Sequence, residues 1–355
     1  FDLFSAIVKN IIAENNKRLE PGYSCNGKKK NAVQLIVVGD FFQLPPVIKK
    51  EDREILVEMY GTEYEPGEIC ERGYAFFSRA WKEMEFHCVK LEEVCRQKDA
   101  EFLGILNDIK YGRNLQNVIA YLESNQSSDL MEEAPYLVGT NAKADKINQA
   151  HMRALDEKTE KKFWAIIEGD VTYEDIKNIS FAKQSLVVNV GAKVMLTAND
   201  ANGEYVNGTM GTIIDISKER GDATCIQVLT DKGKKVDVYR YEREIERQDI
   251  EESKEKDKNG ETVIVKKIVR KIVGSFKQFP IKIAWAMSIH KSQGQTFGQV
   301  NIDPRCWDSG QFYVAVSRAE SVAGIHFMAP IMKQYIRTLS DEVIKILRES
   351  LYSII

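Results

Sequence analysis

The sequence lacks the features that mark a disulfide scaffold, a structural metal site or a membrane span. Its six cysteines are scattered without a C-x-x-C pair, which favours reduced thiols. His87 and Cys88, followed by Cys95, have no second ligand cluster at the spacing of a zinc site. No apolar run approaches the length of a membrane-spanning helix. We therefore expect neither a metal ligand set nor a membrane partner.

The charge is nearly balanced and singles out no partner. The net charge is −3, from 50 Lys and Arg residues against 53 Asp and Glu residues. A nucleic-acid partner would therefore have to be argued from local residues. The chain has 355 residues and 43% hydrophobic composition, enough for two or three globular domains. Residues 1–12 read as an amphipathic helix without an initiator Met, so we expect the chain to begin inside a domain.

Alternating strand and helix patterns predict an α/β fold in most of the chain. Residues 32–40 form a nearly continuous apolar run, typical of a strand buried in a parallel sheet. Residues 99–112 have a helical period that ends at a glycine. Residues 135–141 predict a short strand, and residues 142–155 a helix after it. Residues 332–355 predict a helical tail.

The region between residues 202 and 275 has a different pattern. Apolar and polar residues alternate there, and Lys232–Gly233 and Asn259–Gly260 mark tight turns. This pattern predicts a small β domain. A buried strand is expected at residues 281–288, and α/β character returns after it.

Four short stretches carry candidate chemistry, although each also has an ordinary structural interpretation. In GDFFQLPPV the Gln43 amide could contact a phosphate, or the segment could be a Pro-Pro turn. Asp40 could alternatively be a magnesium ligand, a less favoured interpretation because no phosphate-cradling loop accompanies it. Taken alone, Arg96 in LEEVCRQ could form a surface ion pair. His290 in SIHKSQGQTF could be a structural histidine, and Arg318 in YVAVSRAE could be an ordinary helix residue.

The order and spacing of these stretches resemble the Pif-one family of 5′-to-3′ superfamily I DNA helicases, relatives of RecD. The four stretches resemble helicase motifs III, IV, V and VI, and the resemblance covers nearly the whole chain. It implies an α/β fold of tandem RecA-like P-loop NTPase domains, the first one partial, with an inserted small β-barrel-like domain. The implied ranges are 1–88 for the first domain, 89–201 with 276–355 for the second, and 202–275 for the insertion.

The resemblance also implies roles for individual residues. Gln43 would sense the γ-phosphate of ATP, and Arg96 and Arg318 would neutralise charge on the transferring phosphoryl group. Two groups complete the expected sites. Gly294 and Gln295 would line the nucleotide cleft, and single-stranded DNA would be held, mainly through phosphates, by Thr140, Asn141, Ser288, His290 and Lys291. Phe42 or Trp285 could stack on a base, with core packing the favoured role of Trp285.

One part of the family pattern is missing from the sequence. No G-x-x-x-x-G-K followed by Ser or Thr occurs, and no apolar strand ending in Asp-Glu precedes residue 30. We therefore expect ATP and Mg²⁺ to be held through a segment outside this sequence, and the chain alone to be an inactive, incomplete motor. The alternative is a non-catalytic single-stranded nucleic-acid-binding module. The expected partners are single-stranded DNA and duplex junctions, bound by a monomer. The expected location is the bacterial cytoplasm (nucleoid), or the nucleus or mitochondrion of a eukaryote.

Overall fold

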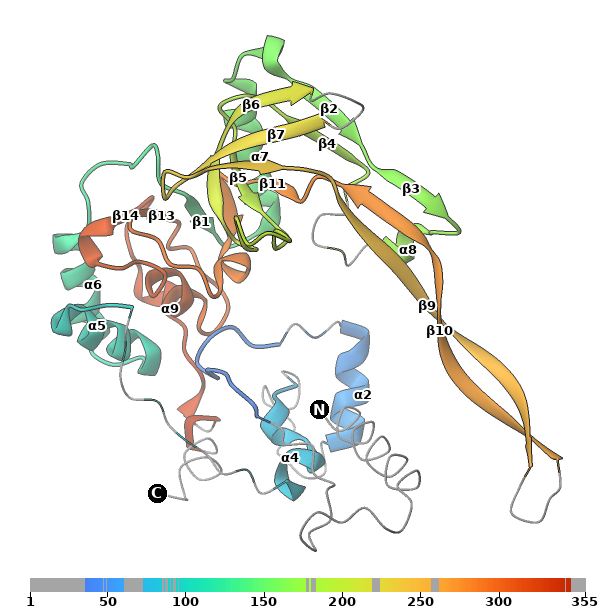
Figure 1. Ribbon diagram of the computed structural model, residues 1–355. Coiled ribbons are helices and arrows are strands. Elements are labelled where there is room, and N and C mark those ends of the chain that lie inside the picture. The colour runs from blue at the N-terminus through green and yellow to red at the C-terminus, as the bar shows by residue number, and fades with distance from the viewer. Residues whose placement is uncertain are drawn as a thin grey trace, which may run out of the picture. The chain divides into compact units, whose positions relative to one another are not determined.

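The computed structural model describes residues 36–345, except for residues 47, 49, 61–72, 85, 87–88, 90, 92–93, 95, 177–178, 180–182, 219–223, 257–261 and 342 (Figure 1). The predicted N-terminal helix and the His87, Cys88 and Cys95 group lie outside these residues. The chain forms two compact units, one of Phe1–Met131 with Ser292–Ile355 and the other of Glu132–Lys291. These two units divide the chain at other residues than the three predicted domains, whose boundaries stay a prediction.

The described residues of the first unit form mainly helices and one pair of parallel strands. The strands β13 (Val300–Ile302) and β14 (Ile325–Phe327) confirm the α/β pattern expected near the C-terminus. Its helices include α2 (Lys50–Tyr60), α4 (Arg79–Glu83), α5 (Ala100–Tyr111), α6 (Leu115–Asn125) and α9 (Gln311–Val316). Short 3₁₀ turns are η1 (Ala75–Phe77), η4 (Val322–Gly324) and η5 (Lys333–Tyr335).

Helix α5 shows how the sequence sets its own limits. The Asp99 carboxylate accepts the N–H groups of Glu101 and Phe102, which caps the start of the helix. Gly112 ends it with φ of +65°, a left-handed conformation that glycine adopts readily. Between these ends, Phe102, Ile105, Leu106 and Ile109 are buried at helical spacing. The predicted helix over residues 99–112 is confirmed.

Two predicted elements of this unit differ from the structure. Ile36, Val37 and Val38 belong to no strand and are 73%, 45% and 84% exposed, so the predicted buried strand is wrong for these residues. A parallel strand is buried by its neighbours, and no described strand pairs with them. The tail is not helical from residue 332. The Arg337 carbonyl accepts a hydrogen bond from the Gly310 N–H, and the Thr338 hydroxyl donates to the Lys110 carbonyl. These tertiary hydrogen bonds take the place of hydrogen bonds within a helix.

The second unit begins with a parallel strand pair covered by a helix. Strand β1 (Tyr136–Val138) pairs with β12 (Ala286–Ser288), and α7 (Asn141–Arg153) packs on both. The Asn148 amide accepts the N–H of Ala286 and donates to its carbonyl, both at 2.8 Å, which fixes the helix to β12. The strand and helix predicted for residues 135–155 are confirmed.

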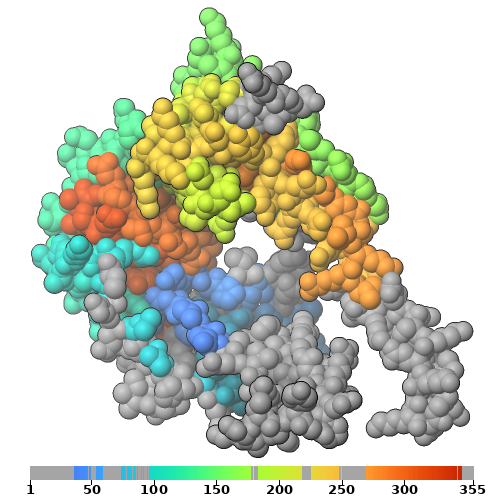
Figure 2. All heavy atoms as spheres, in the orientation of Figure 1, coloured from blue at the N-terminus to red at the C-terminus, as the bar shows by residue number. Residues whose placement is uncertain are grey.

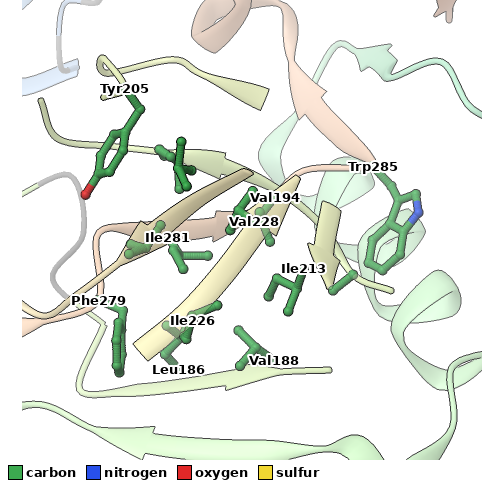
Figure 3. Close-up of a cluster of buried hydrophobic side chains, with 14 residues drawn as sticks. Leu186, Val188, Val194, Tyr205, Ile213, Ile226, Val228, Phe279, Ile281 and Trp285 are labelled. Carbon is green, nitrogen blue, oxygen red and sulfur yellow. The ribbon is translucent and has the colours of Figure 1, made fainter. Parts of the chain in front are cut away.

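Most of the rest of the second unit, as far as the structure describes it, is β structure. A five-stranded antiparallel sheet has the order β11-β5-β6-β7-β8, with an apolar core that includes Val194, Ile213, Ile226 and Val228 (Figure 3). The described residues between 193 and 238, which belong to this sheet and its turns, form the yellow-green to yellow surface in Figure 2. The strands are β5 (Lys193–Leu196), β6 (Met210–Lys218), β7 (Thr224–Thr230), β8 (Lys235–Val238) and β11 (Ile281–Ile283). The β character and the turn at Lys232–Gly233 are confirmed, whereas Asn259–Gly260 lies outside the described residues.

The predicted single strand at residues 281–288 is wrong. Residues 281–283 form β11, which pairs with β5, while residues 286–288 form β12, which pairs with β1. Ala284 and Trp285 separate them, because the chain passes there from an antiparallel sheet to a parallel one.

A long two-stranded ribbon leaves the other sheets of this unit (Figure 1). It consists of β9 (Tyr241–Lys256) and β10 (Thr262–Gln278), and β3 (Ile166–Gly169) pairs with the base of β10. The remaining elements are η2 (Glu157–Thr159), β2 (Lys161–Trp164), α8 (Tyr173–Ile176), β4 (Ser185–Val188) and η3 (Ile289–Ser292).

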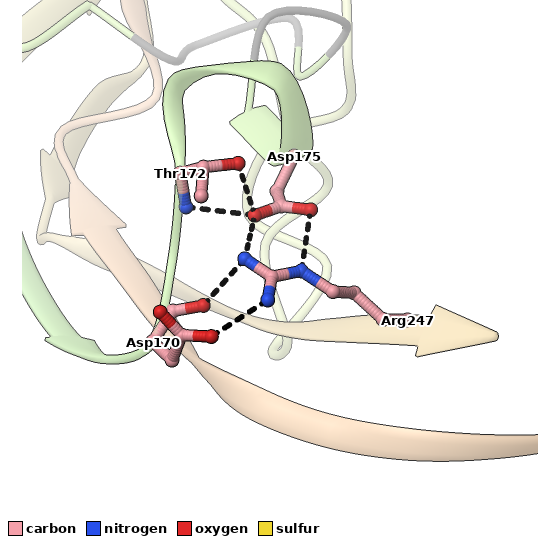
Figure 4. A network of polar contacts seen from close by, with 4 residues as sticks. All are labelled: Asp170, Thr172, Asp175 and Arg247. Atoms are coloured by element: carbon pink, nitrogen blue, oxygen red, sulfur yellow. Dashed lines mark hydrogen bonds and ion pairs between the residues drawn. The ribbon is translucent and has the colours of Figure 1, made fainter. Parts of the chain in front are cut away.

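Arg247 ties β9 to the segment before and within α8 (Figure 4). Its guanidinium donates to both Asp175 oxygens, at 3.0 and 2.6 Å, and to the Asp170 carboxylate at 2.7 Å. The Thr172 hydroxyl donates to the same Asp175 carboxylate. The Arg247 and Thr172 hydrogen bonds hold the pKa of Asp175 well below its usual range. This network anchors the base of the ribbon.

Candidate functional site

Arg96 and Arg318 meet at one residue of the first unit. Arg96 donates from Nη1 to the Ser317 carbonyl at 3.1 Å and from Nε to the Thr296 hydroxyl at 2.9 Å. Arg318 donates from Nη2 to the Ser317 hydroxyl at 2.9 Å. The structure thus brings together two arginines that are 222 positions apart in the sequence, as 318 minus 96.

Arg318 is buried although it carries a positive charge. Its side chain is 2% exposed, and it donates to the carbonyl groups of Val314 at 3.0 Å and Gln295 at 3.3 Å. Neither Arg318 nor Arg96 forms an ion pair with a carboxylate in the described part of the chain. Burial, and then the charge of Arg96, lower the pKa of Arg318 to about 10. A buried arginine paired with a half-buried one is suited to an anion with several oxygens.

Gln97 is a contributor that the sequence reasoning missed. Its buried amide donates to the carbonyl groups of Ser317 at 3.1 Å and Ala319 at 3.0 Å. These two bonds fix the backbone beside Arg96 to the segment that holds Arg318. The only feature of the sequence that could have indicated this role is the position of Gln97 directly after Arg96. The sequence does not show which groups a glutamine amide will contact.

The loop that contains Gln43 lies against the start of α9. Gly310 has φ of +74°, and a β-carbon there would lie 2.7 Å from the Gln43 carbonyl oxygen. The Gln43 side-chain carbonyl accepts a hydrogen bond of 3.4 Å from Gln293. Gln43 therefore lies near the segment that precedes Gly294 and Gln295. Gly294 is exposed, with φ of +82°, and Gln295 follows it in the same turn.

Asp40 is engaged by protein groups rather than free to bind a metal. Its carboxylate forms an ion pair with Lys110 at 3.3 Å and accepts the Phe42 N–H at 3.1 Å and the Tyr313 hydroxyl at 3.5 Å. In the described part of the chain, no group of three His, Cys, Asp or Glu side chains could hold a metal ion. The described residues therefore do not provide a site that fits Mg²⁺. Burial, and then the charge of Asp40, raise the pKa of Tyr313 to about 12.

The second unit holds the five residues expected to bind DNA, at the ends of β1 and β12. Thr140 is exposed, and its hydroxyl accepts the Lys143 N–H at the start of α7. Ser288 ends β12 and is only 3% exposed. A hollow of about 630 Å³ adjoins these ends. Asn141, Ser288 and Lys291 line it, whereas Thr140 and His290 do not.

Neither aromatic candidate is free to stack on a base. Phe42 is 7% exposed and packs edge-on against Tyr111, so its suggested role is wrong. Trp285 is 6% exposed and stacks on His151 of α7 at a centroid distance of 5.2 Å. The favoured core role of Trp285 is confirmed. Among the described residues, no helix is long and apolar enough to cross a membrane.

Known proteins resemble the chain over most of its length, although no family model matches it. The Pif1 ATP-dependent DNA helicase of Bdellovibrio bacteriovorus is 30% identical over 83% of this chain and 58% of its own length. The Campylobacter jejuni Pif1 helicase is 29% identical over 90% of this chain and 66% of its own length. The chain thus spans less than two thirds of these curated relatives.

Solved structures support the same relationship. Bacteroides Pif1 bound to ssDNA has a TM-score of 0.64 and 28% identity, and the match covers 90% of this chain and 68% of that one. Bacteroides Pif1 with ADP-AlF3 and ssDNA has a TM-score of 0.63 and 28% identity, covering 89% of this chain and 66% of that one. The fold is therefore the RecA-like α/β fold of these helicases, and the chain is similar to Pif1 DNA helicases over most of its length.

Proposed function

We propose that this chain forms part of an ATP-dependent motor that moves 5′ to 3′ along single-stranded DNA and unwinds duplex junctions. The observation that carries the proposal is the meeting of Arg96 and Arg318 at Ser317 without a carboxylate partner in the described residues. A buried guanidinium group beside a second, partly exposed one is unfavourable unless an anion joins them. The likeness to Pif1 structures that hold ADP-AlF3 and ssDNA supports a nucleotide phosphate as that anion.

In this proposal, Arg96 and Arg318 neutralise the charge that develops on the γ-phosphate of ATP. Their planar forks of donors suit phosphate oxygens, and an arginine in this role typically raises the rate by about 10³–10⁵. Gln43 contacts the same phosphate, and Gly294 and Gln295 line the cleft beside it. Hydrolysis removes the contacts, which changes the closure of the RecA-like domains and steps the motor along the strand.

The phosphate cradle itself is proposed to come from residues outside this sequence. ATP would supply the phosphoryl group, while Mg²⁺ would be held with that cradle, because the described residues offer no fitting ligand set. This chain alone should therefore hydrolyse no ATP. A DNA-stimulated ATPase measured on the 355-residue chain would contradict this part of the proposal.

DNA is proposed to bind at the ends of β1 and β12 through Thr140, Asn141, Ser288, His290 and Lys291. Contacts to phosphates position a strand without reading its sequence, so affinity should fall steeply with salt. The likeness to Bacteroides Pif1 bound to ssDNA supports this assignment. The test is fluorescence anisotropy with labelled oligo-dT, in which Lys291→Ala and His290→Ala should weaken binding. Unchanged affinity in both variants would refute the assigned surface.

A non-catalytic single-stranded DNA-binding module is the second candidate, favoured by the missing phosphate-cradling motif. It gives no reason for two arginines to meet without a carboxylate. Coding sequence upstream of Phe1 that encodes a phosphate-cradling loop and a strand ending in Asp-Glu would support the motor. Its absence would support the module. A monomeric state, and a nucleoid, nuclear or mitochondrial location, remain proposals.

A further inference from the structure

The hollow beside the proposed DNA surface contains a lysine that belongs to none of the helicase motifs. Lys282 is the middle residue of β11, between Ile281 and Ile283, which both pack toward the apolar core. Because strand side chains alternate, Lys282 faces the opposite way, and it lines the hollow together with its cross-strand partner Met195. Strand β11 therefore directs the Lys282 ammonium group into a hollow that single-stranded DNA could enter.

No carboxylate of the described residues lies within ion-pair distance of the Lys282 ammonium group. It is half-buried, and it forms neither an ion pair nor a side-chain hydrogen bond with any described residue. Carboxylates of Asp145, Glu157 and Glu160 also line the hollow, but each of these residues is exposed to water. Burial, and then the charges of Lys291 and Lys183, lower the pKa of Lys282. A cation kept beside two others is unfavourable in the free protein, and a bound anion would offset that cost.

The wall that α7 forms offers groups that suit an anion, together with the exposed carboxylate of Asp145. Helix α7 begins at Asn141, which lines the hollow, and the first N–H groups of a helix carry a partial positive charge. The amides of Asn141 and Gln149 add neutral donors along the same wall. With a volume of about 630 Å³, the hollow can hold more than a single ion.

We propose that Lys282, with Lys183 and Lys291, forms an additional subsite that binds a backbone phosphate of single-stranded DNA as the strand passes between α7 and β11. The subsite extends the path of the strand from Asn141 and Ser288 onto the face of the small β sheet. It rests on the proposed DNA-binding function. The ligand is the phosphodiester of a strand, rather than a free phosphate ion.

Lys282→Met tests the subsite, because methionine keeps the length and apolar stem of the side chain and removes the charge. We expect affinity for labelled dT20 to fall about tenfold, as for one charge-assisted contact. The slope of log Kd against log salt should fall by about 0.7, as for one phosphate contact on a single strand. Lys282→Arg should retain most of the affinity. Lys235→Met, which removes an exposed lysine of β8 in the same unit, is the matched control and should bind like the parent.

Thermal unfolding separates a folding defect from a lost contact. Lys282→Met should unfold at the same or a higher temperature than the parent, because it removes a charge that is repelled by two others. Weaker binding together with higher stability would support a functional lysine. A lower melting temperature with unchanged salt slope would overturn the inference in favour of a structural role.

Lysine acetylation of the unaltered chain provides a second test that needs no variant. We expect dT20 to protect Lys282 from an N-hydroxysuccinimide ester, and inorganic phosphate at the same phosphate concentration to give no protection. Equal protection by inorganic phosphate would contradict the strand as ligand. Binding of dT20 with no effect of Lys282→Met and no protection would overturn the subsite but leave the proposed function intact. A parent chain that does not bind dT20 would overturn both.

Discussion

The guanidinium groups of Arg96 and Arg318 both donate to Ser317, one to its carbonyl and the other to its hydroxyl. Ser317 is buried and directly follows α9, so a small shift of this helix end would move both arginines together. Gln97 donates to the same Ser317 carbonyl and joins the arginines into one rigid group. A paired site of this kind suits a phosphate, because its oxygens can accept from several directions.

The contact between Gly310 and the Gln43 loop should be sensitive to one added methyl group. Gly310→Ala places a β-carbon 2.7 Å from the Gln43 carbonyl oxygen and also requires a left-handed φ of +74°. Gly233→Ala, at φ of +77° with no atom within 4 Å, is the matched control for the backbone cost alone. We expect the control to lose about 1 kcal/mol of unfolding free energy and Gly310→Ala to lose more. Equal losses in chemical denaturation would show that the loop does not press on Gly310.

The Arg247 network should anchor the ribbon only while Asp175 is ionised. The lowered pKa of Asp175 means that its contribution to stability is present above the unfolded pKa of about 4. This contribution is lost as the pH falls through the lower folded pKa. Asp175→Asn should therefore lower the melting temperature at pH 7, and the difference from the parent should shrink below about pH 4.

Glu168→Gln is the control for the Asp175 experiment, since Glu168 is an exposed residue of β3 nearby. It should change the melting temperature little at either pH. Hydrogen exchange gives a local measure, because the Thr172 N–H donates to Asp175 at 2.7 Å and should exchange faster in Asp175→Asn. An unchanged Thr172 exchange rate would argue against the network as an anchor.

Trp285 should contribute to stability rather than to DNA binding. Its ring is buried against His151 in the core of the second unit, so Trp285→Ala should cost about 3–5 kcal/mol of unfolding free energy. Trp285→Phe should cost less and bind oligo-dT with unchanged affinity. Loss of oligo-dT binding by a stably folded Trp285→Phe variant would show that the ring contacts the strand.

The sequence predicted elements whose limits are set locally. The Asp99 cap and the Gly112 end determine α5, and Gly233 determines the turn between β7 and β8. The sequence failed where distant residues decide the outcome. The apolar run at Ile36–Val38 predicted a buried strand, but burial depends on neighbouring strands that a local pattern cannot show. Phe42 was considered free to stack on a base because its contact with Tyr111 is likewise not visible in a local pattern.

The same distinction applies to the candidate sites. Arg96 and Arg318 were identified through their motifs, but only the structure shows that they share Ser317. Gln97 and Lys282 were missed because their significance comes from burial and from what surrounds them. An amide that donates to two carbonyls, and a half-buried lysine that shares a hollow with two other lysines, have no sequence pattern of their own.

The central claim is that Arg318 acts on the nucleotide and not on the DNA. Its most direct test compares Arg318→Ala with the parent in the full-length protein that carries the phosphate cradle, measuring DNA-stimulated ATP hydrolysis and oligo-dT affinity together. We expect hydrolysis to fall by about 10³-fold or more, as for loss of an arginine finger, while DNA affinity changes little. Normal hydrolysis combined with lost DNA binding would contradict the account.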